Sequence, residues 1–334
     1  MLFSFILASS LLVPSQASEK VRYETIRSLV DVSDKSGIIK VTSVDLGIRK
    51  NHTLVLSVVE NPASNAIIVV EGKNGQGFLP APDVKILSGY VDGYSNSLVA
   101  IGVGTKGVHG LVRLEDEEFV ISTGSYTENL SRQLDAGFFP LKDLQLKEDF
   151  DCKAIPVPQG KKKRSVKRSA AGDGCRTAKI AIDTDYEYTY SLFGGDQTAA
   201  SEYAAIVMGI ITEIYQPQVK LSWEISYLRL WSSNDDPYSS GTTSGALNEM
   251  RSHWISEMSN IERDVAHLFS GRGLGGGVAW LGVMCDTNYG YAVSADLNGS
   301  FPTPWESNQN GNWDLMVIGH ELGHNCGTGH THDS

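Results

Sequence analysis

The segment HELGHNCGTGH, which runs from His320 to His330, constrains the fold of this chain more than any other part of the sequence. His320 and His324 are four residues apart, so on a helix both side chains project from the same face. Gly327 can adopt a left-handed conformation, which would end that helix and turn the chain back. The segment therefore predicts a helix and a tight return that direct His320, His324 and His330 at one point.

Three neutral imidazoles leave a fourth coordination position open for water, which is typical of a catalytic rather than a structural zinc site. Bound zinc lowers the pKa of such a water to about 7. Glu321 follows the first histidine and can reach that water without becoming a ligand. We therefore predict one Zn²⁺ ion held by His320, His324 and His330, with Glu321 as the general base.

Two alternatives compete with this interpretation. An ordinary helix with surface histidines would carry the same residue types without any metal. A catalytically inactive zinc-binding or adhesive protein of the same fold would bind the metal but would have no use for Glu321. The carboxylate beside the first histidine therefore favours an enzyme.

Residues 1–17 are typical of a signal peptide. The apolar run Leu2–Val13 is too short to span a bilayer, and Ser15, Gln16 and Ala17 form a small-x-small cleavage site. We expect a secreted, extracellular protein without a membrane span. Secretion permits disulfides, whose pairing the sequence leaves open. The cysteines are Cys152, Cys175, Cys285 and Cys326.

Residues 18–160 are expected to be rich in strands, because short β-branched segments alternate with Gly, Asn and Pro. A linker over residues 161–174 follows. Its segment KKKRSVKR carries six positive charges in eight residues, which keeps it exposed to a processing protease. We expect cleavage after Arg168, giving Ser169 as the new N-terminus. A nuclear localisation signal is the alternative, and the signal peptide disfavours it.

Residues 175–334 show a mixed pattern of strands and helices, which predicts a twisted α/β sheet. The expected strands are 179–183, 221–231, 265–269 and 278–284. The expected helices are 197–215, 244–261 and 313–326, the last of which ends at Gly327. Residues 169–334 contain 20 acidic and 7 basic side chains, which argues against a nucleic-acid partner.

The segment HELGHNCGTGH resembles the motif of the metzincin metalloproteases, and Asn325 makes it most similar to the adamalysin (reprolysin, ADAM-like) branch. The resemblance extends from about Cys175 to Thr331. It implies a zinc endopeptidase that acts on protein or peptide substrates, with a five-stranded mixed sheet over an active-site cleft. Thr331 stands where adamalysins usually have Asp. The methionine-containing turn of the clan would lie beyond Ser334, so we expect the catalytic domain to be incomplete at its C-terminus.

The stretch GRGLGGGVAWLGVMC, residues 271–285, is similar to the loop and antiparallel edge strand along which such enzymes lay their substrate. The resemblance implies that substrate backbone lies against Gly277, Val278, Ala279 and Trp280. The same stretch contains a GxGxxG match, but a dinucleotide site needs a helix next and the sequence that follows is strand-like.

The stretch LSGYVDGYSNSLVAIGV, residues 87–103, is similar to reprolysin-type propeptides. This similarity implies that the chain carries its own inhibitory propeptide, removed by a processing protease. Reprolysin zymogens often place a propeptide thiolate on zinc, and Cys152 lies just before the basic linker, so Cys152 is a candidate for that switch. A disulfide or an inert thiol remains the alternative role for this cysteine.

Overall fold

The computed structural model describes residues 21–33, 37–44, 46, 51–129, 135–141, 151–158, 176–303 and 312–330. The predicted signal peptide and the basic linker, including Arg168 and Ser169, lie outside these ranges. Cys175 and Thr331 also lie outside them. Within the described ranges, no helix is both long and apolar enough to cross a membrane.

Eight strands of the N-terminal region (residues 21–141) form one antiparallel sheet in the order β1-β10-β9-β8-β7-β6-β3-β2. Their bounds are β1 Val21–Arg22, β2 Ile39–Val44, β3 His52–Val59, β6 Lys85–Val91, β7 Leu98–Val103, β8 Val108–Leu114, β9 Glu117–Ser122 and β10 Asp135–Pro140. Two helices accompany them, α1 Tyr23–Ser33 and α2 Tyr126–Asn129. Ile26 and Val30 of α1 join a core of inward-facing residues from these strands, so α1 covers one face of the sheet.

A second sheet has the order β11-β15-β16-β14-β12-β13-β4-β5. Its five central strands come from the C-terminal region (residues 176–330). They are β12 Arg176–Thr184, β13 Leu221–Trp231, β14 Val265–Phe269, β15 Gly276–Trp280 and β16 Tyr291–Ser294. Four of these strands run parallel and β15 runs antiparallel to β16. The C-terminal region thus contributes five strands to a mixed sheet.

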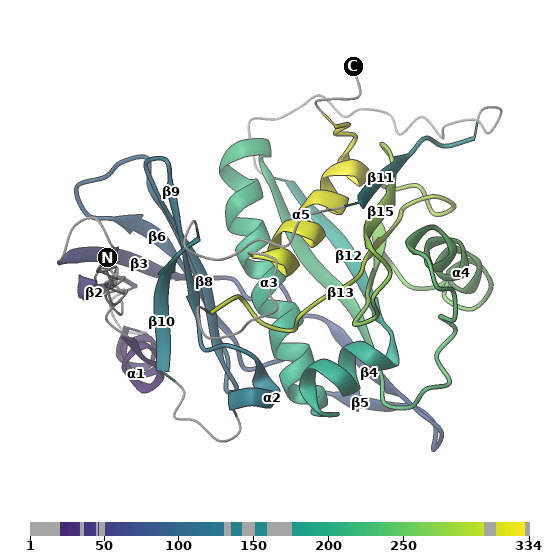
Figure 1. The fold of residues 1–334 in the computed structure, drawn as a ribbon, viewed down its shortest axis with the longest axis horizontal. Coiled ribbons are helices and arrows are strands. Elements are labelled where there is room, and N and C mark those ends of the chain that lie inside the picture. The colour runs from purple at the N-terminus through teal and green to yellow at the C-terminus, as the bar shows by residue number, and fades with distance from the viewer. Residues whose placement is uncertain are drawn as a thin grey trace, which may run out of the picture.

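Three strands of this second sheet come from earlier in the chain, and they occupy both of its edges (Figure 1). At one edge, β4 (Ile67–Glu71) runs parallel to β13, and β5 (Gly77–Leu79) pairs with β4. At the other edge, β11 (Asp151–Ile155) runs parallel to β15. The sequence indicated strands in residues 18–160 but not that three of them pair with strands of the C-terminal region.

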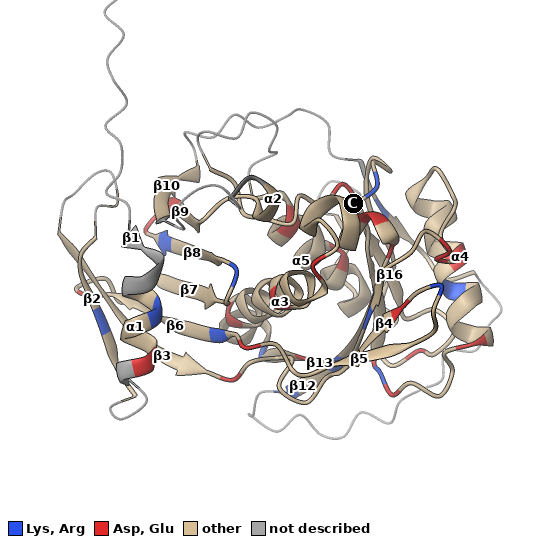
Figure 2. Ribbon diagram, turned by 90° about the horizontal axis from the view of Figure 1, so that it is seen from below, with Lys and Arg blue, Asp and Glu red and all other residues tan. Residues whose placement is uncertain are grey.

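Helix α3 (Gln197–Val219) lies between the two sheets (Figures 1 and 2). It contacts β13 on one side and β6, β7 and β8 on the other. Every residue from Ala199 to Ile211 is buried, because the helix is covered on opposite sides. Asp196 begins the helix by accepting a hydrogen bond from the backbone N–H of Ala199.

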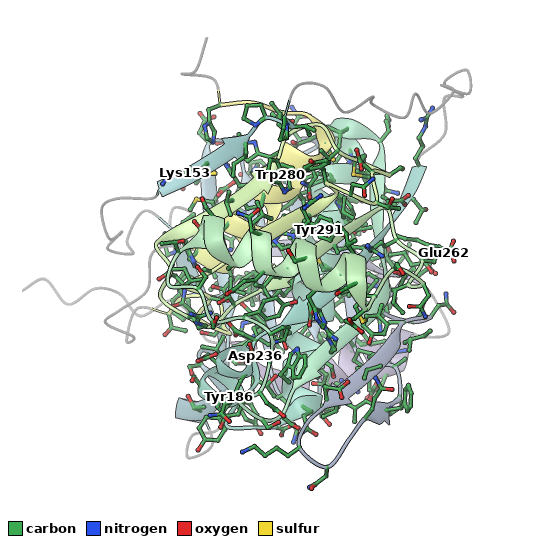
Figure 3. All side chains as sticks on the ribbon, turned by 90° about the vertical axis from the view of Figure 1, so that its right-hand side faces the viewer. Lys153, Tyr186, Asp236, Glu262, Trp280 and Tyr291 are labelled. Atoms are coloured by element: carbon green, nitrogen blue, oxygen red, sulfur yellow. The ribbon has the colours of Figure 1, made fainter. Side chains whose placement is uncertain are left out.

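Helix α4 (Thr243–Ser256) covers the opposite face of the second sheet, and Figure 3 shows it in front of that sheet. Helix α5 (Trp313–Cys326) packs against β15, β16 and α3. A short π-helix, η2 Tyr188–Leu192, precedes α3. The strand expected at 278–284 ends at Trp280, because the chain turns through Gly282 and Cys285, both of which have positive φ angles.

Candidate functional site

Helix α5 and the turn after it bring the three predicted histidines together. The helix ends at Gly327, whose φ of 105° is left-handed, and the N–H of Thr328 donates to the carbonyl of Gly323. The Nε2 atom of His330 lies 3.2 Å from Nε2 of His320 and 3.1 Å from Nε2 of His324. The return predicted from the glycine therefore has the geometry needed to converge three imidazoles.

The thiol of Cys152, on β11, reaches the same cluster from the N-terminal side of the sequence. Its Sγ atom lies 3.3 Å from His324 Nε2 and 3.0 Å from Glu321 Oε1. One potential ligand atom from each of Cys152, His320, His324 and His330 lies within 4.8 Å of the others. Nitrogen and thiolate sulfur are ligands that Zn²⁺ prefers in four-coordinate sites, so this set of donors fits zinc.

The surroundings of the histidine cluster favour the protonation state and ring orientation in which histidines bind a metal ion. Burial, then the charges of His324 and His330, lower the pKa of His320 to about 4, which keeps its imidazole neutral. Nδ1 of His324 lies 2.6 Å from the carbonyl oxygen of Thr328. A hydrogen bond at Nδ1 leaves Nε2 of that ring directed at the cluster, as is usual for metal-binding histidines.

Glu321 is fully buried beside the histidines. Burial raises the pKa of its carboxyl group to about 8, and the hydrogen bond from Cys152 opposes that rise. Gly277 of β15 lies against this carboxylate: a Cβ atom at position 277 would lie 2.3 Å from Glu321 Oε1. A side chain at that position would therefore displace the carboxylate, a constraint that the sequence alone did not reveal.

The residues expected to contact substrate backbone form β15, which pairs with β16 along one side. Its other side pairs with β11 in the register Cys152 with Gly277, Lys153 with Val278, Ala154 with Ala279 and Ile155 with Trp280. Figure 3 shows Lys153, Trp280 and Tyr291 following one another across these neighbouring strands. The side of β15 expected to bind substrate is thus covered by a strand of the same chain.

Asn325 connects the histidine helix to this edge of the sheet. Its buried side-chain amide donates to the carbonyls of Trp280, at 3.0 Å, and Tyr291, at 3.2 Å. The sequence indicated Asn325 only as a mark of a family branch. Its role in fixing α5 against β15 and β16 depends on long-range contacts, for which the local sequence carries no signal.

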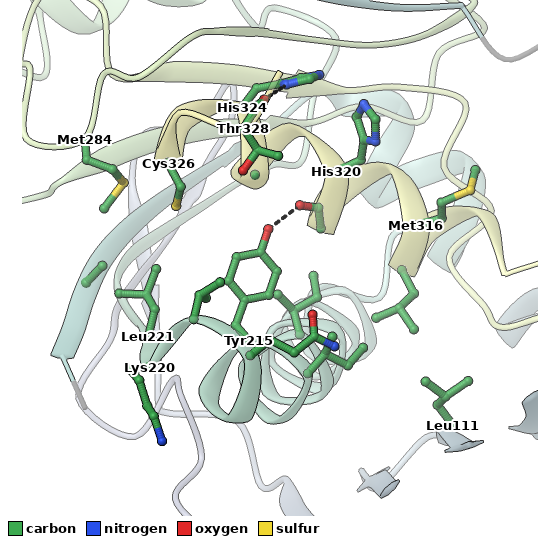
Figure 4. Close-up of a pocket in the computed structure, with 18 of the residues that line it drawn as sticks. Leu111, Tyr215, Lys220, Leu221, Met284, Met316, His320, His324, Cys326 and Thr328 are labelled. Carbon is green, nitrogen blue, oxygen red and sulfur yellow. Dashed lines mark hydrogen bonds between the residues drawn. The ribbon is translucent and has the colours of Figure 1, made fainter. Parts of the chain in front are cut away.

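A cavity of about 1750 Å³ lies between α3, α5 and β8. Its lining includes all three histidines, of which Figure 4 labels His320 and His324. Tyr215 of α3 crosses it and donates a hydrogen bond of 2.5 Å to the carbonyl of Gly319 in α5. This bond ties α3 to the turn of α5 that carries His320. Cys326 and Met316, also in the lining, give the cavity a partly apolar wall.

Comparisons with known proteins agree with this geometry. Residues 175–334 match the family model Reprolysin_5, described as metallo-peptidase family M12. The solved structure of metalloproteinase-II from Bacteroides fragilis is similar in fold, with a TM-score of 0.52 and 11% sequence identity. The likeness covers 93% of this chain and 86% of that chain, so it includes strands of the N-terminal region. No curated protein sequence matches this chain.

The family match lies on the part of the chain that carries the histidine helix and the edge strand. Residues 175–334, which carry the histidine helix, are therefore similar to metallopeptidase family M12, and the chain shares its fold with the solved metalloproteinase.

Proposed function

We propose that this chain is a secreted, zinc-dependent endopeptidase that is synthesised as a zymogen. The observation that carries the proposal is the convergence of three histidines and one buried glutamate beside a strand whose edge the chain itself covers. An inactive metal-binding relative would need the histidines alone. The Oε2 atom of the buried Glu321 has no hydrogen-bond partner among the described residues, which favours a catalytic over a structural role for this carboxylate.

In the proposed mechanism His320, His324 and His330 hold the zinc ion. When bound, zinc supplies Lewis acidity and lowers the pKa of a coordinated water to about 7. Glu321 accepts the proton of the attacking water and delivers it to the leaving amine. The carbonyl of Thr328 keeps the ring of His324 in its ligand orientation.

Substrate binding in this proposal uses the backbone of β15. An extended peptide adds to a free strand edge through main-chain hydrogen bonds, and here the edge comprises Gly277, Val278, Ala279 and Trp280. Asn325 holds that edge at a fixed position relative to α5. The scissile bond of a peptide on β15 would therefore lie beside Glu321, which touches Gly277.

Latency follows from the position of β11. This strand covers the edge of β15, and its Cys152 thiol lies among the three histidines. It therefore blocks both the peptide edge and the position that a catalytic water would take. Cleavage after Arg168 by a processing protease would separate this inhibitory region from Ser169 and the residues that follow.

The proposal is tested on the full-length secreted chain. We expect bound zinc, no peptide hydrolysis before cleavage of the linker, and hydrolysis afterwards that a chelator removes. His324→Ala should lose both zinc and activity, because a ligand is missing. A zinc-free protein, or unchanged zinc content in His324→Ala, would contradict the proposed site.

The thiol is tested separately. Cys152→Ala should raise the activity of the uncut chain only in part, because the pairing of β11 with β15 remains. Cys285→Ala is the matched control, since Cys285 lies near Asp264 and not in the histidine cluster. Equal activities of these two uncut variants would remove Cys152 from the inhibitory mechanism.

A further inference from the structure

Helix α3 of the C-terminal region depends on the N-terminal region for one of its two covered sides. Ile206 packs against Gly102 of β7 so closely that a Cβ atom on this glycine would lie 2.5 Å from Ile206 Cγ2. Gly209 in turn accommodates Ile86 of β6, whose Cδ1 would lie 2.6 Å from an added Cβ. Such interlocking has the density of a protein interior. Removing the N-terminal region would expose this apolar side of α3 to water.

The polar groups on the same side of α3 also find their partners in the N-terminal region. Glu202 is 2% exposed, and its carboxylate accepts hydrogen bonds from Thr105 N at 2.8 Å, Thr105 Oγ1 at 2.5 Å and Lys106 N at 3.2 Å. Tyr126 donates to Asp196 at the start of α3, at 2.6 Å. These bonds satisfy the buried Glu202 carboxylate and the half-buried Asp196, and they fix the orientation of one region on the other.

The second surface that the N-terminal region covers is the edge of β13 that faces away from β12. Residues 67–71 pair with 227–231 along five consecutive positions. Ile68 and Val69 are buried at 1% and 2% exposure, one on each face of the sheet. Ile68 joins a core that both regions form, and Val69 joins a core whose other buried residues come from the C-terminal region. An uncovered edge of this kind presents unpaired backbone groups that invite association with other chains.

Strand β11 is attached far more lightly. Its described side chains, Cys152 to Ile155, are half-buried or exposed, whereas Ile68 and Val69 are buried. Among the described strands it pairs with β15 alone. It also lies at the edge of the sheet opposite to β4 and β5. Its departure would leave the surfaces around α3 and β13 unchanged.

We propose that the N-terminal region stays bound to the C-terminal region after the linker is cut, as a second, non-covalent chain of the working enzyme. The docking surface is the outer side of α3 and the edge of β13, and its occupant is the N-terminal fragment itself. Only β11 has to leave its site for the edge of β15 to open. This inference rests on the proposed zymogen function, since it assigns the fate of the cleaved segment.

The test uses the full-length chain with a sequence-specific protease site in place of KKKRSVKR. After complete cleavage, the two fragments should elute together at a 1:1 ratio in native size-exclusion chromatography, and separate only in denaturant. A C-terminal fragment that elutes alone, folded and soluble, would overturn the inference.

A variant pair sharpens the test. Gly209→Ala places a Cβ against Ile86 and should speed release of the N-terminal fragment at least tenfold in dilute denaturant. Gly77→Ala, where nothing lies within 4 Å of the added atom, is the matched control and should release at the wild-type rate. Both are cut only after the covalent chain has folded, as circular dichroism verifies. Equal release rates in a correctly folded Gly209→Ala protein would contradict the proposed surface.

Peptide hydrolysis is measured on the same fractions. Activity found only in a separated C-terminal fragment would contradict the proposed retention of the N-terminal fragment, but it would still support the proposed protease function. Co-elution without any hydrolysis, even after zinc is added, would do the reverse: the N-terminal chain is retained and the proposed enzymatic function fails.

Discussion

Two segments of the N-terminal half extend the same sheet at its two edges, and they do so in different ways. Both β4 and β11 add a parallel strand over five residue positions. Ile68 and Val69 of β4 are buried in the cores on both faces of the sheet, whereas the described side chains of β11 are half-buried or exposed. Cys152 of β11 instead reaches the histidine cluster.

This comparison shows that two strands with the same amount of backbone pairing can be held in a sheet with different strength. Main-chain hydrogen bonds contribute about 1 kcal/mol each in net terms, whereas complete burial of an isoleucine side chain contributes about 1.5–3 kcal/mol. The segment with buried side chains is therefore suited to hold the fold, and the segment without them is suited to block a site and leave. Four predictions test this division.

The largest effect is expected near the β11 edge, in the chain cut at the linker as proposed. Glu321→Gln should lower the rate of peptide hydrolysis by about 10²- to 10⁴-fold with zinc still bound, because it removes the proposed general base and none of the proposed ligands. The control is Glu71→Gln on β4, at the opposite edge, which should leave the rate unchanged. Steady-state kinetics with metal analysis checks both. Undiminished turnover in Glu321→Gln would place the chemistry elsewhere.

The next effect concerns stability and should be confined to the other edge. Ile68→Ala should lower the free energy of unfolding by about 2–5 kcal/mol, because it leaves a cavity in a closed core. Ile155→Ala on β11 should cost about 1 kcal/mol or less, since that side chain is only half-buried. Urea titration of the uncut chain measures both. Similar losses would mean that the two segments are attached alike.

A smaller effect on hydrolysis is expected from glycine substitutions near the two edges of the sheet, because the space beside the two glycines differs. Gly277→Ala should reduce hydrolysis by up to about 10²-fold, because the added Cβ would displace the Glu321 carboxylate. Gly77→Ala on β5 has open space and should leave hydrolysis unchanged. Kinetics at matched zinc occupancy tests the pair. A fully active Gly277→Ala enzyme would show that the carboxylate tolerates the shift.

The smallest effect is a pH dependence of the free energy of unfolding, which arises where the N-terminal region contacts the C-terminal region at His109. His109 of β8 accepts a hydrogen bond of 3.3 Å from Phe301 N of the C-terminal region, and burial lowers its pKa from 6.5 to about 3. The unfolded chain therefore binds more protons between pH 6.5 and 3, and stability is lost as the pH falls through that window. At pH 5 the loss from His109 should be about 2 kcal/mol relative to neutral pH.

His109→Asn, which cannot titrate, should show this acid loss reduced by that amount in urea unfolding at pH 7 and pH 5. The comparison with wild type separates the contribution of His109 from that of Asp314, because both proteins contain Asp314. The Asp314 carboxylate accepts a hydrogen bond from Tyr203, whose ring contacts that of His109. Burial raises the pKa of Asp314 to about 6, so this group acts in the opposite direction between pH 6 and 3.8. Identical pH dependence of the two proteins would argue that His109 titrates normally.

Local sequence signals predicted much of the fold and the candidate site. The alternation in 221–231 and the apolar spacing after Asp196 marked β13 and α3, because both patterns repeat within one element. The helix expected at 244–261 ends at Ser256, since element ends depend on contacts beyond the pattern. The spacing of His320, His324 and Gly327 likewise implied the convergence that α5 and its turn display.

The sequence by itself thus indicated most helices and strands of residues 176–330 and where three imidazoles meet, because those depend on neighbours a few residues apart. It did not mark helix α1 or strand β16. Only the tertiary structure decided which strand pairs with which. Backbone N–H and C=O groups are the same in every residue, so nothing in residues 67–71 or 151–155 states that they close opposite edges of one sheet. The same holds for Gly277 against Glu321, a contact made by residues far apart in the chain and fixed by packing.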